Sequence, residues 1–84
     1  MHKVYVLESK KDSELYIGCT QDIDQRMIYH KTGRVKSTKY RRPLQLIYIE
    51  SFQDKHRAFN TERFYKTAKG KRVLKKKMED CRIV

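Results

Sequence analysis

The chain of 84 residues contains 21 Lys and Arg against 10 Asp and Glu, a net charge of +11. We expect one domain, residues 1–84, because a chain this short buries only about 60–65% of the surface that its unfolded form exposes. Six tyrosines and three phenylalanines argue against a disordered polyelectrolyte. The basic excess suits a polyanionic partner, since each phosphate that it neutralises releases counterions.

The charge favours nucleic acid over a membrane as the partner. No segment pairs a basic helix face with large apolar residues, as a membrane-surface anchor would. A ribosome-bound or general RNA-binding protein would show the same charge balance. No apolar run approaches the ~20 residues that span a bilayer, and the first residues do not resemble a signal peptide. Cys19 and Cys81 provide neither a disulfide framework nor a Cys-x-x-Cys metal motif. We expect a cytoplasmic protein with no membrane partner.

The first predicted elements are two short strands. Residues 3–8 contain a β-branched and aromatic run, and a polar break precedes a second strand over residues 15–19. Alternation along the second strand puts Tyr16 and Gly18 on one face. A register with Tyr5 opposite Tyr16 would bring the two phenols side by side, whereas a shift by one residue would send them to opposite faces.

A helix follows the second strand. Thr20 is the predicted N-cap, and the helix runs to about Thr32, where Gly33 ends it. Arg26 and His30 are four residues apart and are therefore neighbours on the helix surface.

Residues 34–42 are predicted to form a basic loop before the single proline. Its cationic and hydroxyl side chains are of the kinds that grip backbone phosphates. For each lysine taken singly, a solvated surface position is the simpler interpretation. The candidate nucleic-acid-binding residues are Lys36, Lys39, Tyr40, Arg41 and Arg42.

The strongest strand signal covers residues 44–52, and Asp54 is the predicted cap of a second helix that continues to about Lys69. In this helix Ala58, Glu62 and Tyr65 fall on one inward-facing stripe. Glu62 is thus a carboxylate on an apolar stripe. Alternatively, it is an exposed residue at the edge of the stripe that pairs with Lys66.

Gly70 is expected to end the second helix. Residues 71–77 then form a short last helix, and residues 82–84 are expected to fray.

Several of these side chains suit phosphodiester chemistry. Arg26 is a planar, permanently charged phosphate ligand, and His30 is a general base or a hydrogen-bond relay. Tyrosine is a poor base at its usual pKa of about 10, which nearby cations would lower. Glu62 supplies a hard oxygen ligand for Mg²⁺, which often keeps its waters and accepts one or two carboxylates. Spacing alone indicates only a basic nucleic-acid-binding α/β domain.

The order of the motifs adds a resemblance. Residues 16–30 read Tyr-Ile-Gly-x-Thr-x-Asp-Ile-x-x-Arg-x-x-x-His, with Val4-Tyr5-Val6 before them and Glu62 after them. This pattern resembles the GIY-YIG nuclease superfamily, and is similar to its small single-domain bacterial members and to the N-terminal incision module of the excinuclease C subunit. Val4 stands where the family's first motif has glycine.

The resemblance implies an α+β fold, a small three-stranded antiparallel sheet flanked by about three helices. It implies a Mg²⁺- or Mn²⁺-dependent endonuclease, with one ion, that hydrolyses DNA with weak or structure-based specificity in repair or recombination. Branched or damaged DNA is the implied partner, with a partner protein as a further source of specificity. The implied roles are water activation and site organisation for Tyr5 and Tyr16, phosphate binding for Arg26, proton relay for His30, and metal binding for Glu62, with Tyr40 contacting the same site. The alternative is a DNA- or RNA-binding module of the same fold without turnover.

Overall fold

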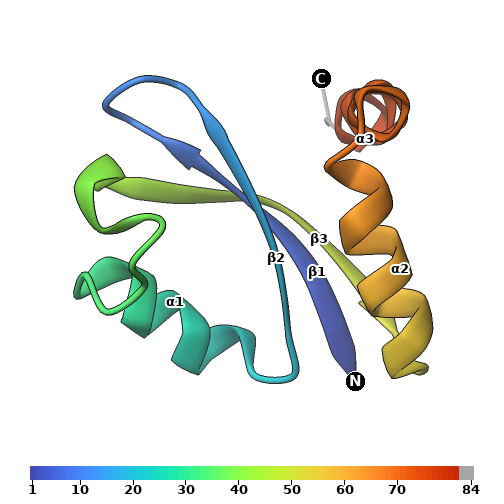
Figure 1. The fold of residues 1–84 in the computed structure, drawn as a ribbon, viewed down its shortest axis with the longest axis horizontal. Coiled ribbons are helices and arrows are strands. Elements are labelled where there is room, and N and C mark those ends of the chain that lie inside the picture. The colour runs from blue at the N-terminus through green and yellow to red at the C-terminus, as the bar shows by residue number, and fades with distance from the viewer. Residues whose placement is uncertain (82–84) are drawn as a thin grey trace.

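A computed structural model describes residues 1–81, and the predicted fraying of residues 82–84 lies outside this range. Its three strands form one antiparallel sheet in the order β2-β1-β3. Helix α1 covers one face of the sheet, and α2 and α3 cover the other (Figure 1). The α+β prediction is therefore confirmed. The elements are β1 (His2–Ser9), β2 (Leu15–Thr20), α1 (Ile23–Lys31), a short 3-10 helix (Lys39–Arg41), β3 (Leu44–Phe52), α2 (Lys55–Tyr65) and α3 (Ala68–Asp80).

The predicted register of the first hairpin is wrong by two residues. Tyr5 pairs with Gly18, and Tyr16 pairs with Leu7. The Ser9 N–H donates to the Glu14 carbonyl at 2.9 Å and closes the loop of this hairpin. Because side chains alternate with a period of two, this shift keeps both phenols on one face.

The main hydrophobic core lies between the sheet and the α2–α3 pair. Residues of β1 and β2 that point to this face pack against a row of residues on α2 and against one side of α3. The stripe predicted for α2 is confirmed at Ala58 and Tyr65, which are both buried. The buried members of this core are Val4, Val6, Ile17, Ala58, Tyr65 and Leu74.

Helix α1 starts two residues later than predicted. Thr20 still belongs to β2, where it pairs with Lys3, so the chain needs two more residues to turn. The N-cap is Asp22, whose Oδ1 accepts from the Gln25 N–H at 3.0 Å. Gly33 ends the helix as predicted, with a φ of +79° that favours glycine.

The corner between α2 and α3 differs from the prediction. Helix α2 ends at Tyr65 rather than near Lys69, and α3 is longer than residues 71–77. Thr67 caps α3 by accepting from the Gly70 N–H, so Gly70 lies inside its first turn. A Cβ atom at position 70 would overlap the carbonyl oxygen of Phe64. Glycine is thus required here for close backbone approach and not as a helix stop.

Within residues 1–81, no helix is long and apolar enough to cross a membrane.

Gly70→Ala should destabilise the fold by about 1–3 kcal/mol, because the added methyl meets backbone that cannot rotate away. Urea denaturation followed by circular dichroism measures the change in the free energy of unfolding. Lys69→Ala, an exposed neighbouring change on the same helix, should stay within about 0.5 kcal/mol of the unmodified chain. Equal stability of the two variants would contradict the close approach between Gly70 and the Phe64 carbonyl.

Candidate active site

The α1 face of the sheet holds a buried chain of three polar side chains. The phenol oxygen of Tyr5 lies 2.9 Å from Nε2 of His30, and Nδ1 of His30 lies 2.8 Å from Oγ1 of Thr38. Tyr5, His30 and Thr38 are each at most 1% exposed. The Thr38 hydroxyl donates to the Val35 carbonyl at 3.4 Å. With that hydrogen engaged, Thr38 accepts from Nδ1–H, and Nε2 accepts the phenol proton of Tyr5.

Tyr16 completes a cluster of three rings with Tyr5 and His30. Its ring centroid lies 6.3 Å from that of Tyr5 and 5.2 Å from the imidazole, which it meets edge-on. Tyr16 is only half-buried, whereas the other two rings are buried. Tyr16 is therefore the phenol of the pair that a bound substrate can reach.

Gly18 explains how two strands and a helix can place these rings so closely. It pairs with Tyr5 across the hairpin, and a Cβ atom at position 18 would overlap the Tyr5 phenol. The phenol therefore lies directly over the backbone of β2. The glycine of the Tyr-Ile-Gly motif is needed for this close approach.

Burial governs the protonation of the cluster. It raises the pKa of Tyr5 well above the usual range, with a further contribution from Tyr16 and only partial opposition from Arg26. Arg26 does lower the pKa of Tyr5, as expected of a nearby cation, but burial outweighs this effect. Burial and the Arg26 charge both lower the pKa of His30. At neutral pH the pair is a phenol bonded to a neutral imidazole.

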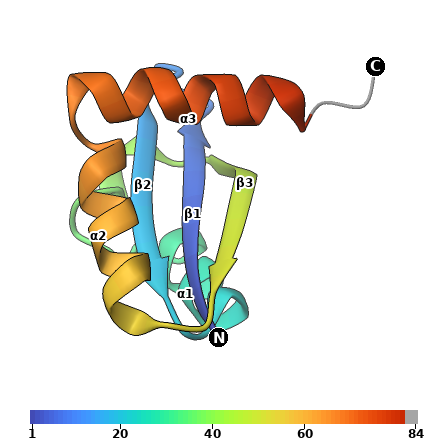
Figure 2. The same ribbon diagram turned by 90° about the vertical axis from the view of Figure 1, so that its right-hand side faces the viewer.

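Glu62 lies on α2, which covers the opposite face of the sheet from the cluster. Helix α2 packs against β1 and β2 and lies beside β2, which is an edge strand of the sheet (Figure 2). The charge of Glu62 contributes to the raised pKa of Tyr5 and, after the larger effect of burial, to that of Cys19 on β2. Arg26 acts on Tyr5 from α1.

The structure combines parts of the two interpretations of Glu62, which lies on the stripe without being exposed and also pairs with Lys66. Its side chain is 19% exposed on the stripe of Ala58 and Tyr65, and its Oε2 lies 3.4 Å from the ammonium of Lys66. Among residues 1–81, no group of three or more His, Cys, Asp or Glu side chains is arranged to hold a metal. A partly buried lone carboxylate with one partly exposed lysine fits an ion that keeps most of its waters.

The predicted nucleic-acid-binding residues all lie on the surface, in and beside the 3-10 helix. Arg42 is engaged with the backbone, donating to the carbonyls of Lys39 and Lys31 at 3.0 and 3.2 Å. Tyr40 is 77% exposed, with its ring against the Lys39 ammonium, so it is not packed into the ring cluster. The loop thus presents Lys36, Lys39, Tyr40 and Arg41 to solvent.

Thr38 is the site residue that the sequence did not indicate. It stands eight positions after His30 in a run of basic and hydroxyl residues, where Ser37 has the same chemistry and is exposed. The contact forms only because the loop folds back against α1. No periodicity in the sequence marks such a pairing.

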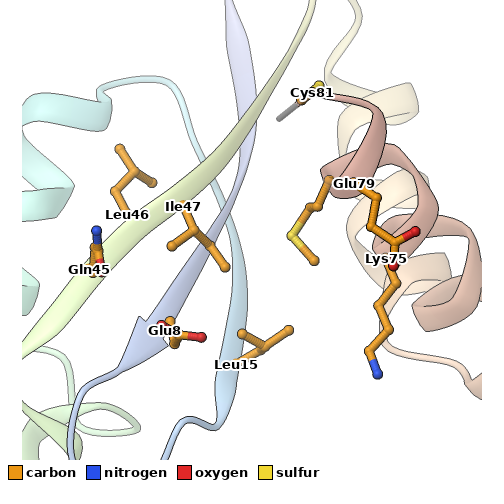
Figure 3. Close-up of a pocket in the computed structure, with 9 residues that line it drawn as sticks. Glu8, Leu15, Gln45, Leu46, Ile47, Lys75, Glu79 and Cys81 are labelled. Atoms are coloured by element: carbon orange, nitrogen blue, oxygen red, sulfur yellow. The ribbon is translucent and has the colours of Figure 1, made fainter. Parts of the chain in front are cut away.

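One cavity lies away from these residues. A space of about 680 Å³ opens between the sheet and the C-terminal half of α3, lined by Leu15, Ile47 and Lys75 among others (Figure 3). None of the predicted catalytic or metal-binding residues lines it. Another space, of about 620 Å³, is lined by His30 and Arg42 among others, so it adjoins the candidate site.

Residues 1–78 match the model of the GIY-YIG catalytic domain. The chain belongs to the GIY-YIG nuclease family. The UPF0213 protein SSP2268 of Staphylococcus saprophyticus is 41% identical over 75 residues, which cover 88% of this chain and 90% of that protein. The UPF0213 protein YazA of Bacillus subtilis is 41% identical over 66 residues, 77% of this chain and 66% of that protein. The solution NMR structure of the UPF0213 protein BH0048 from Bacillus halodurans superposes with a TM-score of 0.55 at 36% identity, covering 87% of this chain and 80% of that one.

Within this GIY-YIG domain, Thr38→Val should remove the hydrogen bond that keeps the proton of the neutral His30 imidazole on Nδ1. The change leaves a buried ring nitrogen without a partner, which costs about 1–3 kcal/mol of stability. Nitrogen NMR of the ring reports the tautomer, and chemical denaturation reports the stability. Ser37→Ala is the matched control on an exposed neighbouring hydroxyl. An unchanged tautomer in Thr38→Val would contradict the hydrogen-bonded chain.

The stability of the domain should fall as the solution is acidified below about pH 6.5. The folded pKa of His30 is lowered, so between that value and the unfolded value of about 6.5 the unfolded chain binds a proton that the folded chain does not. Stability is therefore highest above this window and declines through it. Denaturation midpoints measured across about pH 4.5–8 report this pH dependence. It should be absent in His30→Gln and present in His56→Gln, a change at an exposed histidine.

Proposed function

We propose that this protein is a metal-dependent endonuclease that hydrolyses DNA phosphodiester bonds. The observation that carries the proposal is the buried Tyr5–His30–Thr38 chain, with the half-buried Tyr16 in edge contact with the imidazole. Membership of a nuclease family supports the reaction class.

Arg26 binds the scissile phosphate in this proposal. Its guanidinium is charged at all relevant pH values and offers a planar fork to phosphate oxygens. It already lies close enough to Tyr5 and His30 to influence the pKa values of both. The same positive charge would stabilise the extra negative charge of the pentacoordinate transition state.

Tyr5 and Tyr16 divide the two roles expected of the tyrosines. Tyr5 is buried and remains a phenol, so it organises the site by donating to His30. Tyr16 is half-buried in edge contact with the imidazole and is the phenol that contacts the attacking water. His30 is neutral and can take up a proton that arrives through the Tyr5 phenol.

Glu62 holds one Mg²⁺ or Mn²⁺ ion in this proposal. A bound ion of this kind supplies charge neutralisation at the phosphate and a more acidic water. Glu62 is shielded enough to hold a fixed geometry, and Lys66 is the only cation paired with it among the described residues. An incoming ion would displace that ammonium.

The substrate that we propose is DNA recognised by its structure, such as branched or damaged DNA in repair or recombination. The exposed basic loop supports contacts to the backbone, which carry no sequence information. Target specificity beyond this would come from a partner protein, and the proposed compartment is the cytoplasm.

Glu62→Gln should abolish nicking of supercoiled plasmid and of branched DNA, reducing the rate by about 10²-fold or more, because it removes the proposed metal ligand while keeping the shape of the side chain. Gel assays with Mg²⁺ or Mn²⁺ measure the rate, and chelation of the metal should stop cleavage. Glu79→Gln, at an exposed carboxylate on α3, should cleave normally.

Cleavage that survives Glu62→Gln would contradict the metal-binding role. Salt-sensitive DNA or RNA binding by the unmodified chain, without metal-dependent cleavage, would instead identify the binding module that the sequence left as the alternative.

A further inference from the structure

Positive charge is concentrated on the pair of helices that the proposed mechanism uses least. Residues 55–80 contain ten Lys and Arg against three acidic residues, a net charge of +7 out of +11. The acidic residues are Glu62, in the candidate site, and Glu79 and Asp80, at the end of α3. The basic residues are Lys55, Arg57, Arg63, Lys66, Lys69, Lys71, Arg72, Lys75, Lys76 and Lys77.

The basic residues of α3 form an exposed stripe. Gly70 and Leu74 are buried on the side of α3 that packs against the rest of the domain. Lys69, Arg72 and Lys76 recur at i, i+3 and i+7 and are all exposed. At 1.5 Å per residue they extend over about 10 Å of one helix side.

This stripe lacks acidic partners. Among residues 1–81, the only basic side chain of α3 in an ion pair is Lys77, which binds Glu50 at 3.3 Å. Lys71 and Lys75 extend the unpaired charge along the flank of the helix. Like charges three and four residues apart destabilise a helix, so a ligand that neutralised them would relieve repulsion.

The chemistry of the stripe indicates the kind of partner. Val73 is the only large apolar residue exposed on α3, at 36%, because the other apolar side chains of the helix face the sheet. Insertion into a membrane surface requires a broad apolar face, and the core of a protein interface is depleted in charge. A regular row of cations with almost no apolar surface instead matches the phosphates of a double helix.

We propose that α3 is a second DNA contact of this protein, in which Lys69, Arg72 and Lys76 hold the phosphate backbone of a duplex. The proposal rests on the proposed function for the identity of the polyanion and extends it by naming a surface that takes no part in catalysis. Helix α3 begins six residues after Glu62 and crosses one end of the sheet, running from the α2 side to beyond β3 (Figure 2). The basic loop lies on the other side of the sheet (Figure 1).

The test measures binding without cleavage. The full chain carrying Glu62→Gln is titrated, without divalent metal, into a fluorescent linear DNA duplex at several salt concentrations. Each neutralised phosphate contributes about 0.9 to the slope of log K against log salt. Adding Lys69→Gln, Arg72→Gln and Lys76→Gln should therefore make the slope shallower by about 2–3.

The matched control removes the same charge elsewhere. Lys10→Gln, Lys11→Gln and Lys55→Gln alter three exposed lysines outside α3, and the slope should change by less than about one contact. Replacing Lys69 and Lys76 by arginine should keep the original slope, because the charge is kept. Circular dichroism confirms that each variant is folded.

Equal slopes for the α3 variant and its control would overturn the proposal, as would tighter binding to anionic phospholipid vesicles than to the duplex. Both results leave metal-dependent cleavage by the unmodified chain untouched. Conversely, absence of cleavage together with a shallower slope for the α3 variant contradicts only the proposed function. The two proposals therefore fail separately.

Discussion

The buried phenol of Tyr5 is the contact on which the arrangement of the site depends. It lies over the backbone of Gly18, donates towards His30, and so ties the first hairpin to α1. His30 is also hydrogen-bonded to Thr38, which connects α1 to the loop that follows it. A chain of hydrogen bonds inside a protein is costly when partly satisfied and rigid when complete. Here no buried side-chain polar atom within the described residues lacks a partner.

The same burial shapes the chemistry. A phenol in this position resists ionisation, and an imidazole beside it resists protonation, because each charged form would lose hydration. The pair is therefore held in its neutral forms, with one shared proton between oxygen and nitrogen. Tyr16, at the open side of the cluster, is left as the phenol in contact with solvent.

The sheet separates two kinds of basic surface. On the α1 side, Arg42 is used to fasten the loop to the backbone, which leaves its neighbours to face solvent. On the other side, Lys77 is used to fasten α3 through Glu50 and the Tyr65 phenol, which leaves the outer stripe of α3 unpaired. In the loop and on α3 alike, one basic side chain is bound to other groups of the protein, while its basic neighbours remain free to contact a polyanion.

The sequence by itself determined β3 with its bounds and the stripe that carries Glu62, because these follow from local periodicity. The α+β fold class followed from the order of the motifs and the family that this order resembles. Tertiary structure alone decided the hairpin register, the helix bounds at Asp22 and Gly70, and the place of Thr38. Register depends on loop closure, and the Gly70 corner depends on a carbonyl from another helix. The pKa of Tyr5 also depends on what buries it, so a nearby arginine was a poor guide to its protonation. Contacts between residues distant along the chain leave no periodic trace in the sequence, and these contacts set the geometry of the site.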